Sequence, residues 1–245
     1  MNGPTVVDIS NLSKSYRRGP EIVHALREVT FDLPMGEVVA LVGPSGSGKT
    51  TLLNILCGWD RPDEGEITWP RESADHLDWT ATSIVPQRLG LVDELTIYEN
   101  VELPLMLAGV SESEATQRVE PLLQTLGLDH ISLHHPDEAS LGEQQRTALA
   151  RALVASPRLL LADEPTGHQD AQSELAVFRA LRLLASEGGT CLLATHNLDA
   201  TRFCHRTLRV DEGRVTVEPR ADEDDLDREL SPFAPRGPQP GGERP

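Results

Sequence analysis

Short apolar runs alternate with polar turns rich in glycine and proline along most of the chain. These runs predict strands, because four to eight apolar or alternating residues between turn signals fit a buried strand. The predicted strands are Thr5–Leu12, about Leu26–Leu33, Glu37–Val42, Leu159–Ala162 and Thr190–Ala194. A further pair, Leu208–Val210 and Val215–Val217, flanks Glu212-Gly213 and predicts a hairpin.

Helical periodicity separates the predicted strands. It predicts helices at Lys49–Cys57, in several pieces across about Leu89–Ala155, and at Ala171–Glu187 before Gly188–Gly189. Within the long middle stretch, helix starts are predicted by the Ser/Thr-x-x-Glu capping pattern at Thr96–Glu99, Ser111–Glu114 and Ser140–Glu143. Strands that alternate with helices favour an α/β fold with a largely parallel sheet.

The charge of the chain changes which partners are plausible. The formal net charge is -17 and the pI is about 4.8. This charge opposes binding to a phosphate backbone, so we expect no nucleic acid partner.

The longest apolar runs are strand-sized, and Met1–Leu12 lacks the pattern of a secretory signal. We therefore expect any membrane association to come through another subunit. Three cysteines with no close pairing fit reduced thiols in a cytoplasm.

The composition changes near Pro219. An acidic run, Asp222–Asp227, is followed by a stretch rich in proline and glycine, Ser231–Pro245. Such a segment buries too little apolar surface to offset its ordering entropy. We predict a folded domain over residues 1–218 and a disordered tail over 219–245, with an acidic interaction tail as the alternative.

A glycine-rich loop lies between a predicted strand and a predicted helix. It reads Gly43-Pro44-Ser45-Gly46-Ser47-Gly48-Lys49-Thr50, followed by Thr51, and matches the Walker A pattern in full. Glycines let backbone amides surround phosphates, lysine supplies a compact cation, and the threonine hydroxyl suits Mg²⁺. Lys49 is also one of two lysines, with Lys14, among 22 basic residues. The loop predicts a site for a nucleoside triphosphate, with ATP and Mg²⁺ as cofactors.

Two adjacent carboxylates follow the apolar strand Leu159–Ala162. Asp163 is placed to hold Mg²⁺, and Glu164, on the opposite side of the chain, to accept a proton from an attacking water. Alone, a strand that ends in solvated acids is common. With a Walker A loop in the same chain, the catalytic interpretation is favoured.

From about Val6 to Val217 the chain resembles ABC-type ATP-binding subunits. Within them it is most similar to the lipoprotein-release, macrolide-export and cell-division group, through Leu95–Leu105 and Glu143–Arg146. The resemblance implies a P-loop NTPase fold of the ABC ATPase type. Its parts would be a RecA-like parallel-sheet core, an N-terminal antiparallel β subdomain and a helical subdomain at about 88–155.

The resemblance also implies roles for single residues. Tyr16 would stack on adenine, and Gln87 would contact the metal and the lytic water ahead of a loop that faces a permease. His196 would contact the γ-phosphate, beside Glu164 as general base and Lys49 on the phosphates. Thr50, Gln87 and Asp163 would be the metal site.

The sequence departs from the family pattern in three places. The signature motif reads Ala139-Ser140-Leu141-Gly142-Glu143, with a leucine where the family has a glycine; Ser140 and Gly142 would bind the γ-phosphate of a second subunit. Gln169 replaces a leucine before Asp170, which remains at a subunit contact. The segment Thr68–Thr82 is shorter and more acidic than in relatives, which leaves its local fold open.

These features predict an ATP-hydrolysing subunit that drives a membrane permease of the export type. Its partners would be the permease and a second copy or a related ATP-binding subunit, at the cytoplasmic face of the membrane. The alternative is a nucleotide-gated regulator of a membrane partner, as in the cell-division branch, because Leu141 fits slow or asymmetric hydrolysis. A soluble ABC-type ATPase that acts on DNA or ribosomes is disfavoured by the acidic charge and the single cassette.

Overall fold

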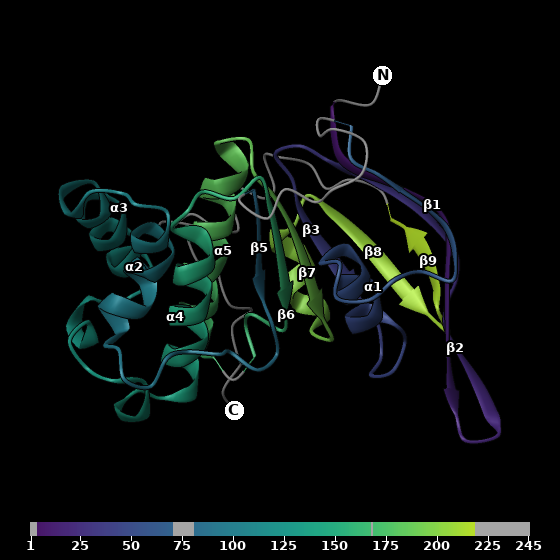
Figure 1. Cartoon of the computed structure of the whole chain (residues 1–245), viewed down its shortest axis with the longest axis horizontal. Coiled ribbons are helices and arrows are strands. Elements are labelled where there is room, and N and C mark those ends of the chain that lie inside the picture. Colours follow the sequence, from purple (N-terminus) through teal and green to yellow (C-terminus); the bar gives the residue numbers. More distant parts are fainter. Residues whose placement is uncertain (1–3, 71–80, 168, 219–245) are drawn as a thin grey trace, which may run out of the picture.

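Two sheets and a cluster of helices make up the computed structural model, which describes residues 4–70, 81–167 and 169–218 (Figure 1). The strands are β1 Thr5–Arg18, β2 Glu21–Pro34, β3 Val38–Val42, β4 Glu64–Thr68, β5 Thr82–Val85, β6 Leu159–Asp163, β7 Thr190–Thr195, β8 Arg206–Asp211 and β9 Arg214–Val217. The helices are α1 Lys49–Leu56, α2 Ile97–Leu107, α3 Glu112–Thr125, α4 Leu141–Leu153 and α5 Ala171–Ser186, with short 3-10 turns η1 Asp129–Ile131, η2 Pro136–Glu138 and η3 Leu198–Phe203.

The larger sheet carries the strand order β5-β6-β7-β3-β8-β9. Its strands are parallel except β9, which pairs antiparallel with β8 through the predicted hairpin. The central strands are buried on both faces because alternate residues enter two different cores. Val38, Ala40 and Val42 of β3 enter one core, and Val39 and Leu41 enter the other. The predicted α/β fold with a largely parallel sheet is confirmed.

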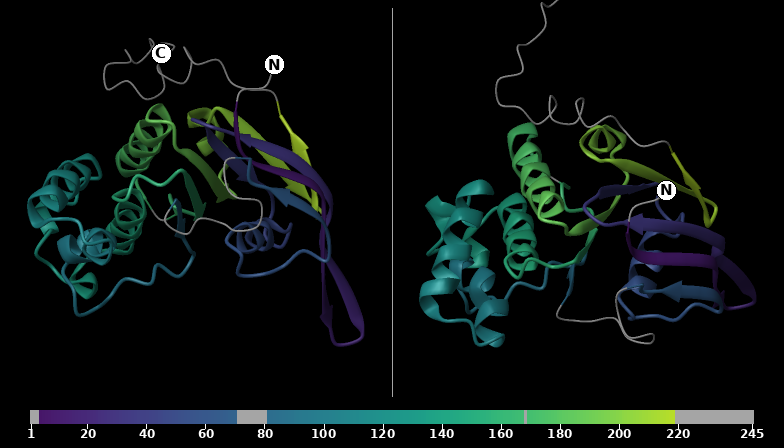
Figure 2. Two further views of the ribbon diagram at one scale, coloured as in Figure 1. Left: turned by 45° about the horizontal axis from the view of Figure 1, so that its top comes forward. Right: turned by 90° about the horizontal axis from the view of Figure 1, so that it is seen from above.

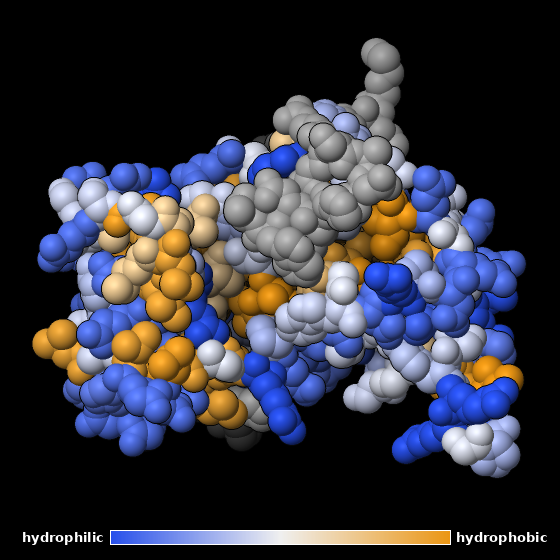
Figure 3. Space-filling view, viewed as in Figure 1, coloured by the Kyte–Doolittle hydropathy of each residue, from blue (hydrophilic) through white to orange (hydrophobic). Residues whose placement is uncertain are grey.

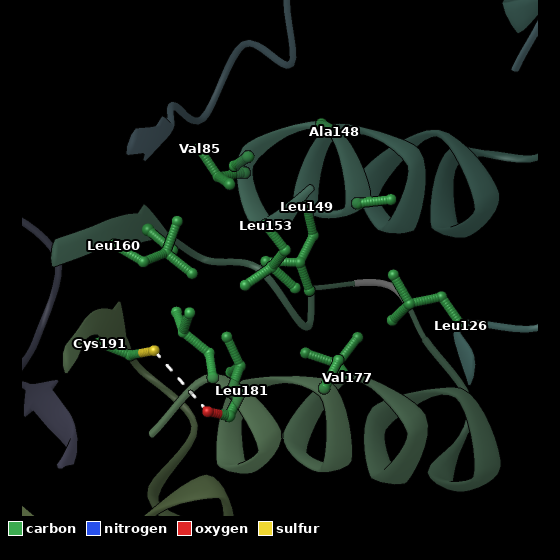
Figure 4. Close-up of a cluster of buried hydrophobic side chains, with 14 of the residues drawn as sticks. Val85, Leu126, Ala148, Leu149, Leu153, Leu160, Val177, Leu181 and Cys191 are labelled. Carbon is green, nitrogen blue, oxygen red and sulfur yellow. Dashed lines mark hydrogen bonds between the residues drawn. The ribbon is translucent and has the colours of Figure 1, made fainter. Parts of the chain in front are cut away.

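The first of these cores joins the sheet to α4 and α5. Figure 4 shows Leu160 of β6 beside Leu149 and Leu153 of α4, with Val177 and Leu181 of α5 completing the layer. All five side chains are buried. This packing places α4 beside the strand that ends at Asp163, the predicted metal ligand, directly before Glu164, the predicted catalytic residue.

The smaller sheet is antiparallel, with the order β2-β1-β4. It covers the second core, as the N-terminal β subdomain implied by the family resemblance. The prediction that the first strand ends at Leu12 is wrong, because β1 continues to Arg18. Beyond Leu12 its residues pair with β2 in a long hairpin, from Lys14↔Leu26 to Arg18↔Glu21. This hairpin projects from the sheet in Figure 1.

Helices α2, α3 and α4 gather at one end of the molecule, away from the β1–β2 hairpin (Figures 1 and 2). The predicted helix starts are confirmed: Thr96 and Ser140 each form a reciprocal capping box, and Ser111 accepts from the Glu114 amide. The sequence placed the helical pattern from about Leu89, but the first helix begins at Ile97. The segment before it, residues 86–96, is an irregular loop that contains Gln87 and leads to α2.

Two predictions fall wholly or mainly outside the described residues. The tail over 219–245 lies there, as do residues 71–80 of the segment Thr68–Thr82. Within the described ranges, no helix combines the length and the hydrophobicity that crossing a bilayer requires.

Candidate functional site

The glycine-rich loop joins the end of β3 to the start of α1. Gly48 caps α1 with a φ of 113°, and a Cβ there would lie 2.3 Å from the carbonyl oxygen of Ala25. A Cβ on Gly43 would lie 2.2 Å from the carbonyl oxygen of Val210. Both positions therefore require glycine, because neighbouring backbone, not a flexible side chain, fills the space.

The polar groups of this loop suit a phosphate. Lys49 Nζ donates to the carbonyl oxygens of Gly43 at 2.8 Å and Pro44 at 3.1 Å, which holds the ammonium over the loop. Ser47 Oγ is buried and lacks a hydrogen-bond partner among the described residues. With the amides at the N-terminus of α1, these groups fit an anionic group placed above the loop.

Thr50 and Asp163 bring two oxygen ligands together from α1 and β6. Thr50 Oγ1 donates to Asp163 Oδ2 at 2.9 Å. Burial raises the pKa of Asp163, the Thr50 hydrogen bond lowers it, and the neighbouring charge of Glu164 raises it again. A hydroxyl and a carboxylate are the hard oxygen donors that Mg²⁺ prefers, so the pair fits this ion.

Glu164 turns away from Asp163 because of its backbone. Its φ is 54°, a left-handed conformation that costs a non-glycine residue about 1–2 kcal/mol. The side chain is held by the end of β7: Oε1 accepts from the His196 amide at 3.0 Å and lies 2.8 Å from His196 Nδ1. Oε2 accepts from Thr195 Oγ1 at 3.2 Å. The geometry therefore fixes the Glu164 carboxylate at the carboxyl edge of the sheet.

A cavity of about 410 Å³ connects these groups. Its lining comprises Tyr16, Val23, Ala25, Ser45, Gly46, Gly48, Lys49, Thr50, Thr51, Gln87, Asp163 and Glu164. The volume is in the range of small-ligand pockets. Tyr16, from the β1–β2 hairpin, gives the cavity an aromatic wall, while Gln87, after β5, joins the carboxylates. The structure thus brings ten of the predicted site residues, Tyr16 and Gln87 among them, into one cavity.

His196 and the signature motif border an adjoining cavity of about 330 Å³. This second cavity shares Ser45, Gln87, Asp163 and Glu164 with the first, and adds Leu141 and His196. Leu141 is the first residue of α4 and is half exposed. Because Leu141 has an ordinary helical position, the fold of the single chain does not require a glycine there.

Ser140, Gly142 and Asp170 are not among the residues that line the 410 Å³ cavity. Ser140 is the N-cap of α4. Its hydroxyl accepts from the Glu143 amide and donates to the Glu143 carboxylate. Asp170 is the N-cap of α5 and accepts from the amides of Gln172 and Ser173, both at 2.9 Å. Within one chain, Ser140 and Asp170 have capping contacts; their predicted contacts with a second subunit stay a prediction.

Two residues that the sequence did not point to support this site through hydrogen bonds. Asp60 accepts from the Tyr16 hydroxyl at 2.6 Å. Asn100 is fully buried and bonds four backbone groups of the loop that follows Gln87. No local pattern could have found Asp60, which lies 44 residues from Tyr16. For Asn100, an amide inside an apolar helical run was the available signal.

Comparisons with known proteins agree on one family. A family model described as "ABC transporter" matches residues 26–167. The chain is 40% identical over 223 residues to the "Lipoprotein-releasing system ATP-binding protein LolD" of Geobacter metallireducens, covering 87% of this chain and 99% of the relative. The protein of the same description from Pseudomonas syringae pv. tomato is 40% identical over 224 residues, covering 88% and 99%.

Two solved structures of ATP-binding proteins have a fold similar to that of this chain. The ATP-binding cassette MJ0796, as a dimer in a post-hydrolysis state bound to ADP and Pi, matches with a TM-score of 0.79 at 34% identity. The match covers 88% of this chain and 99% of that one. A second structure, described as the ATP-binding subunit of an ABC transporter, matches with a TM-score of 0.76 at 28% identity over 92% of this chain and 99% of that one.

Proposed function

The chain belongs to the ABC transporter family as an ATP-binding, ATP-hydrolysing subunit, and we propose that it powers a membrane permease of an export-type system. The ATP-binding domain spans residues 1–218 in this proposal, with a helical subdomain at about 88–155. Its relatives are described as lipoprotein-releasing system proteins, which makes a lipid-modified protein the cargo class to test first.

The continuous cavity from Tyr16 to Glu164 is the observation that carries the proposal. Tyr16 stacks on the adenine at one end. The loop Gly43–Gly48 and Lys49 surround the phosphates, with Thr51 at the start of α1. At the far end, Glu164 accepts the proton of the attacking water.

In this proposal Thr50, Asp163 and Gln87 would hold Mg²⁺, which would neutralise the charge that develops on the phosphates. His196 orients the Glu164 carboxylate through the 2.8 Å contact and meets the γ-phosphate. In this proposal water attacks the γ-phosphate directly, so positioning and fixed charge supply most of the rate enhancement.

A second ATP-binding subunit completes the site. Ser140 and Gly142 border no part of the chain's own nucleotide cavity, so in the proposal they bind the γ-phosphate held by another copy or by a related subunit. Asp170 and Gln169 lie at the same contact. The MJ0796 cassette, the similar structure described above, is a dimer, which supports this arrangement.

A membrane partner is supported by the surface of the helical end. Large apolar side chains are exposed there: Met106 at 59%, Leu107 at 81% and Leu133 at 79%. Figure 3 shows apolar residues gathered over this end of the molecule. In the proposal the loop after Gln87 and this surface meet the permease at the cytoplasmic face of the membrane, and the acidic chain has no nucleic acid partner.

The alternative, a nucleotide-gated regulator of a membrane partner, is favoured by one observation. Leu141 places a branched, half-exposed side chain beside Gln87, Glu164 and His196, where a glycine would leave room. Substitution Leu141→Gly should accelerate hydrolysis if this side chain slows the cycle, and unchanged turnover would remove the observation that favours a regulator.

Reconstitution tests the export proposal. The chain is co-expressed with its membrane partner, purified as a complex and placed in vesicles. ATP-dependent release of a lipid-modified protein, abolished by Glu164→Gln, supports the exporter. A four-span partner whose extracellular hydrolase is activated by ATP, with no cargo released, favours the regulator.

A further inference from the structure

The proposed ATPase mechanism gives no role to Lys14. It is one of only two lysines in the chain, and the other is Lys49 of the phosphate loop. Its side chain is 12% exposed, although it starts from the projecting β1–β2 hairpin. The side chain therefore lies along the protein surface, where fixed partners can hold its ammonium.

Three acceptors surround the Lys14 ammonium. Nζ donates to the carbonyl oxygen of Arg61 at 2.7 Å, and it lies 3.0 Å from Asp60 Oδ1 and 3.3 Å from Asp63 Oδ1. An ammonium carries three N–H donors that point in different directions, whereas the N–H donors of a guanidinium all lie in one plane. The arrangement therefore uses a lysine in a chain where every other basic residue outside the phosphate loop is an arginine.

The same acceptors tie the hairpin to the loop that follows α1. Asp60 Oδ2 accepts from the Tyr16 hydroxyl at 2.6 Å, and Asp63 Oδ2 accepts from the Ser15 amide at 2.7 Å. A hydroxyl–carboxylate bond this short is a strong, charge-assisted one. The pKa of Asp60 is lowered, first by the Tyr16 hydroxyl and then by Lys14, so the carboxylate stays charged at neutral pH.

Lys14 also contacts the Tyr16 ring itself. Its ammonium lies over one face, 5.3 Å from the ring centroid, within the range of a cation–π interaction. Tyr16 lines the nucleotide cavity and is 38% exposed. The ring is thus fixed at its hydroxyl by Asp60 and covered by Lys14, which leaves one face for a flat ligand.

We propose that Lys14 and Asp60 are positioning residues that hold the Tyr16 ring ready to stack on the base of the bound nucleotide. This inference rests on the proposed nucleotide site. Without the two contacts, Tyr16 would have to be immobilised when the ligand binds. Ordering one such side chain costs binding free energy, and we expect an affinity loss of about three- to tenfold, which is about 0.7–1.4 kcal/mol.

The test compares a ligand that has a base with one that lacks it. Dissociation constants are measured by calorimetry with MgCl₂ for the non-hydrolysable ATP analogue AMP-PNP and for inorganic tripolyphosphate. The variants are Lys14→Met, which keeps the side-chain length without the charge, Asp60→Ala and Tyr16→Phe. Arg118→Met, which removes a charge from an exposed ion pair on α3, is the matched control.

We expect the three variants to weaken AMP-PNP about three- to tenfold and to leave tripolyphosphate within about twofold, while Arg118→Met changes neither. In a Tyr16→Ala background, Lys14→Met should add no further loss. Equal weakening of both ligands would mean that Lys14 merely supports the fold, and unchanged AMP-PNP affinity would remove its role altogether. A wild-type chain that binds neither ligand would overturn the nucleotide site itself.

Discussion

The Nδ1 atom of His196 lies 2.8 Å from Oε1 of Glu164, and the backbone amide of His196 donates to the same oxygen at 3.0 Å. The contact joins the ends of two neighbouring parallel strands, β6 and β7. Together with the left-handed backbone of Glu164, it fixes a carboxylate at the edge of the nucleotide cavity. A base held in place before the reaction saves the cost of orienting it during the reaction.

The first prediction concerns this carboxylate. Glu164→Gln keeps the size of the side chain and removes its ability to accept a proton, so steady-state ATP hydrolysis should fall at least about 100-fold. ATP binding should persist, and size-exclusion chromatography with ATP should show a trapped dimer. Full activity in Glu164→Gln would exclude Glu164 as the general base.

The second prediction separates helix capping from catalysis at Ser140. Ser140→Ala and Thr96→Ala each remove the hydroxyl of a reciprocal capping box, so each should lower the free energy of unfolding by about 1 kcal/mol. Only Ser140→Ala should also reduce ATP hydrolysis. If both variants lose stability and neither loses activity, Ser140 is a cap and nothing more.

The third prediction concerns Asn100, which ties α2 to the loop after Gln87. Asn100→Ala leaves partly buried backbone groups of Val92, Leu95 and Thr96 without these hydrogen bonds, and should destabilise the chain by about 1–3 kcal/mol. Hydrogen exchange should rise in residues 88–100. The exposed amide of Gln117 on α3 is the control, and Gln117→Ala should be nearly neutral. Equal exchange in both variants would contradict the role of Asn100.

The fourth prediction concerns the three cysteines, which are unpaired and buried. Burial raises the pKa of the Cys57 thiol and of the Cys204 thiol to about 12, and raises that of Cys191 as well. Because the thiolate is the reactive form, none should react with a thiol reagent at pH 8 in the folded protein. All three should react after unfolding in guanidinium. A fast-reacting thiol in the native protein would contradict the buried placement.

The phosphate site could be predicted from the sequence because its constraints are local. A Cβ on Gly43 or on Gly48 would lie 2.2 Å or 2.3 Å, respectively, from a neighbouring backbone oxygen, and the apolar strands before Gly43 and Asp163 are buried on both faces. Each of these features leaves a continuous pattern in the chain. The strand ends, the loop and the following helix were therefore placed correctly.

The hairpin extension and its contacts could not be predicted in this way. Beyond Leu12, β1 is mostly polar; it pairs with β2 and, at Ser13, with Glu64 of β4, and it contacts residues 60–63. Those partners are 44 to 49 residues away, so no local periodicity reports them. The contacts of Ser140, Gly142 and Asp170 with a second subunit stay a prediction, because they involve a second chain.

ATP hydrolysis by the purified chain, measured beside Lys49→Ala, tests the central claim most directly. Lys49 is the ammonium held over the phosphate loop by Gly43 and Pro44. We predict that the wild type hydrolyses ATP in the presence of Mg²⁺ and that Lys49→Ala does not. Equal hydrolysis by the two proteins would show that the activity does not arise at this site.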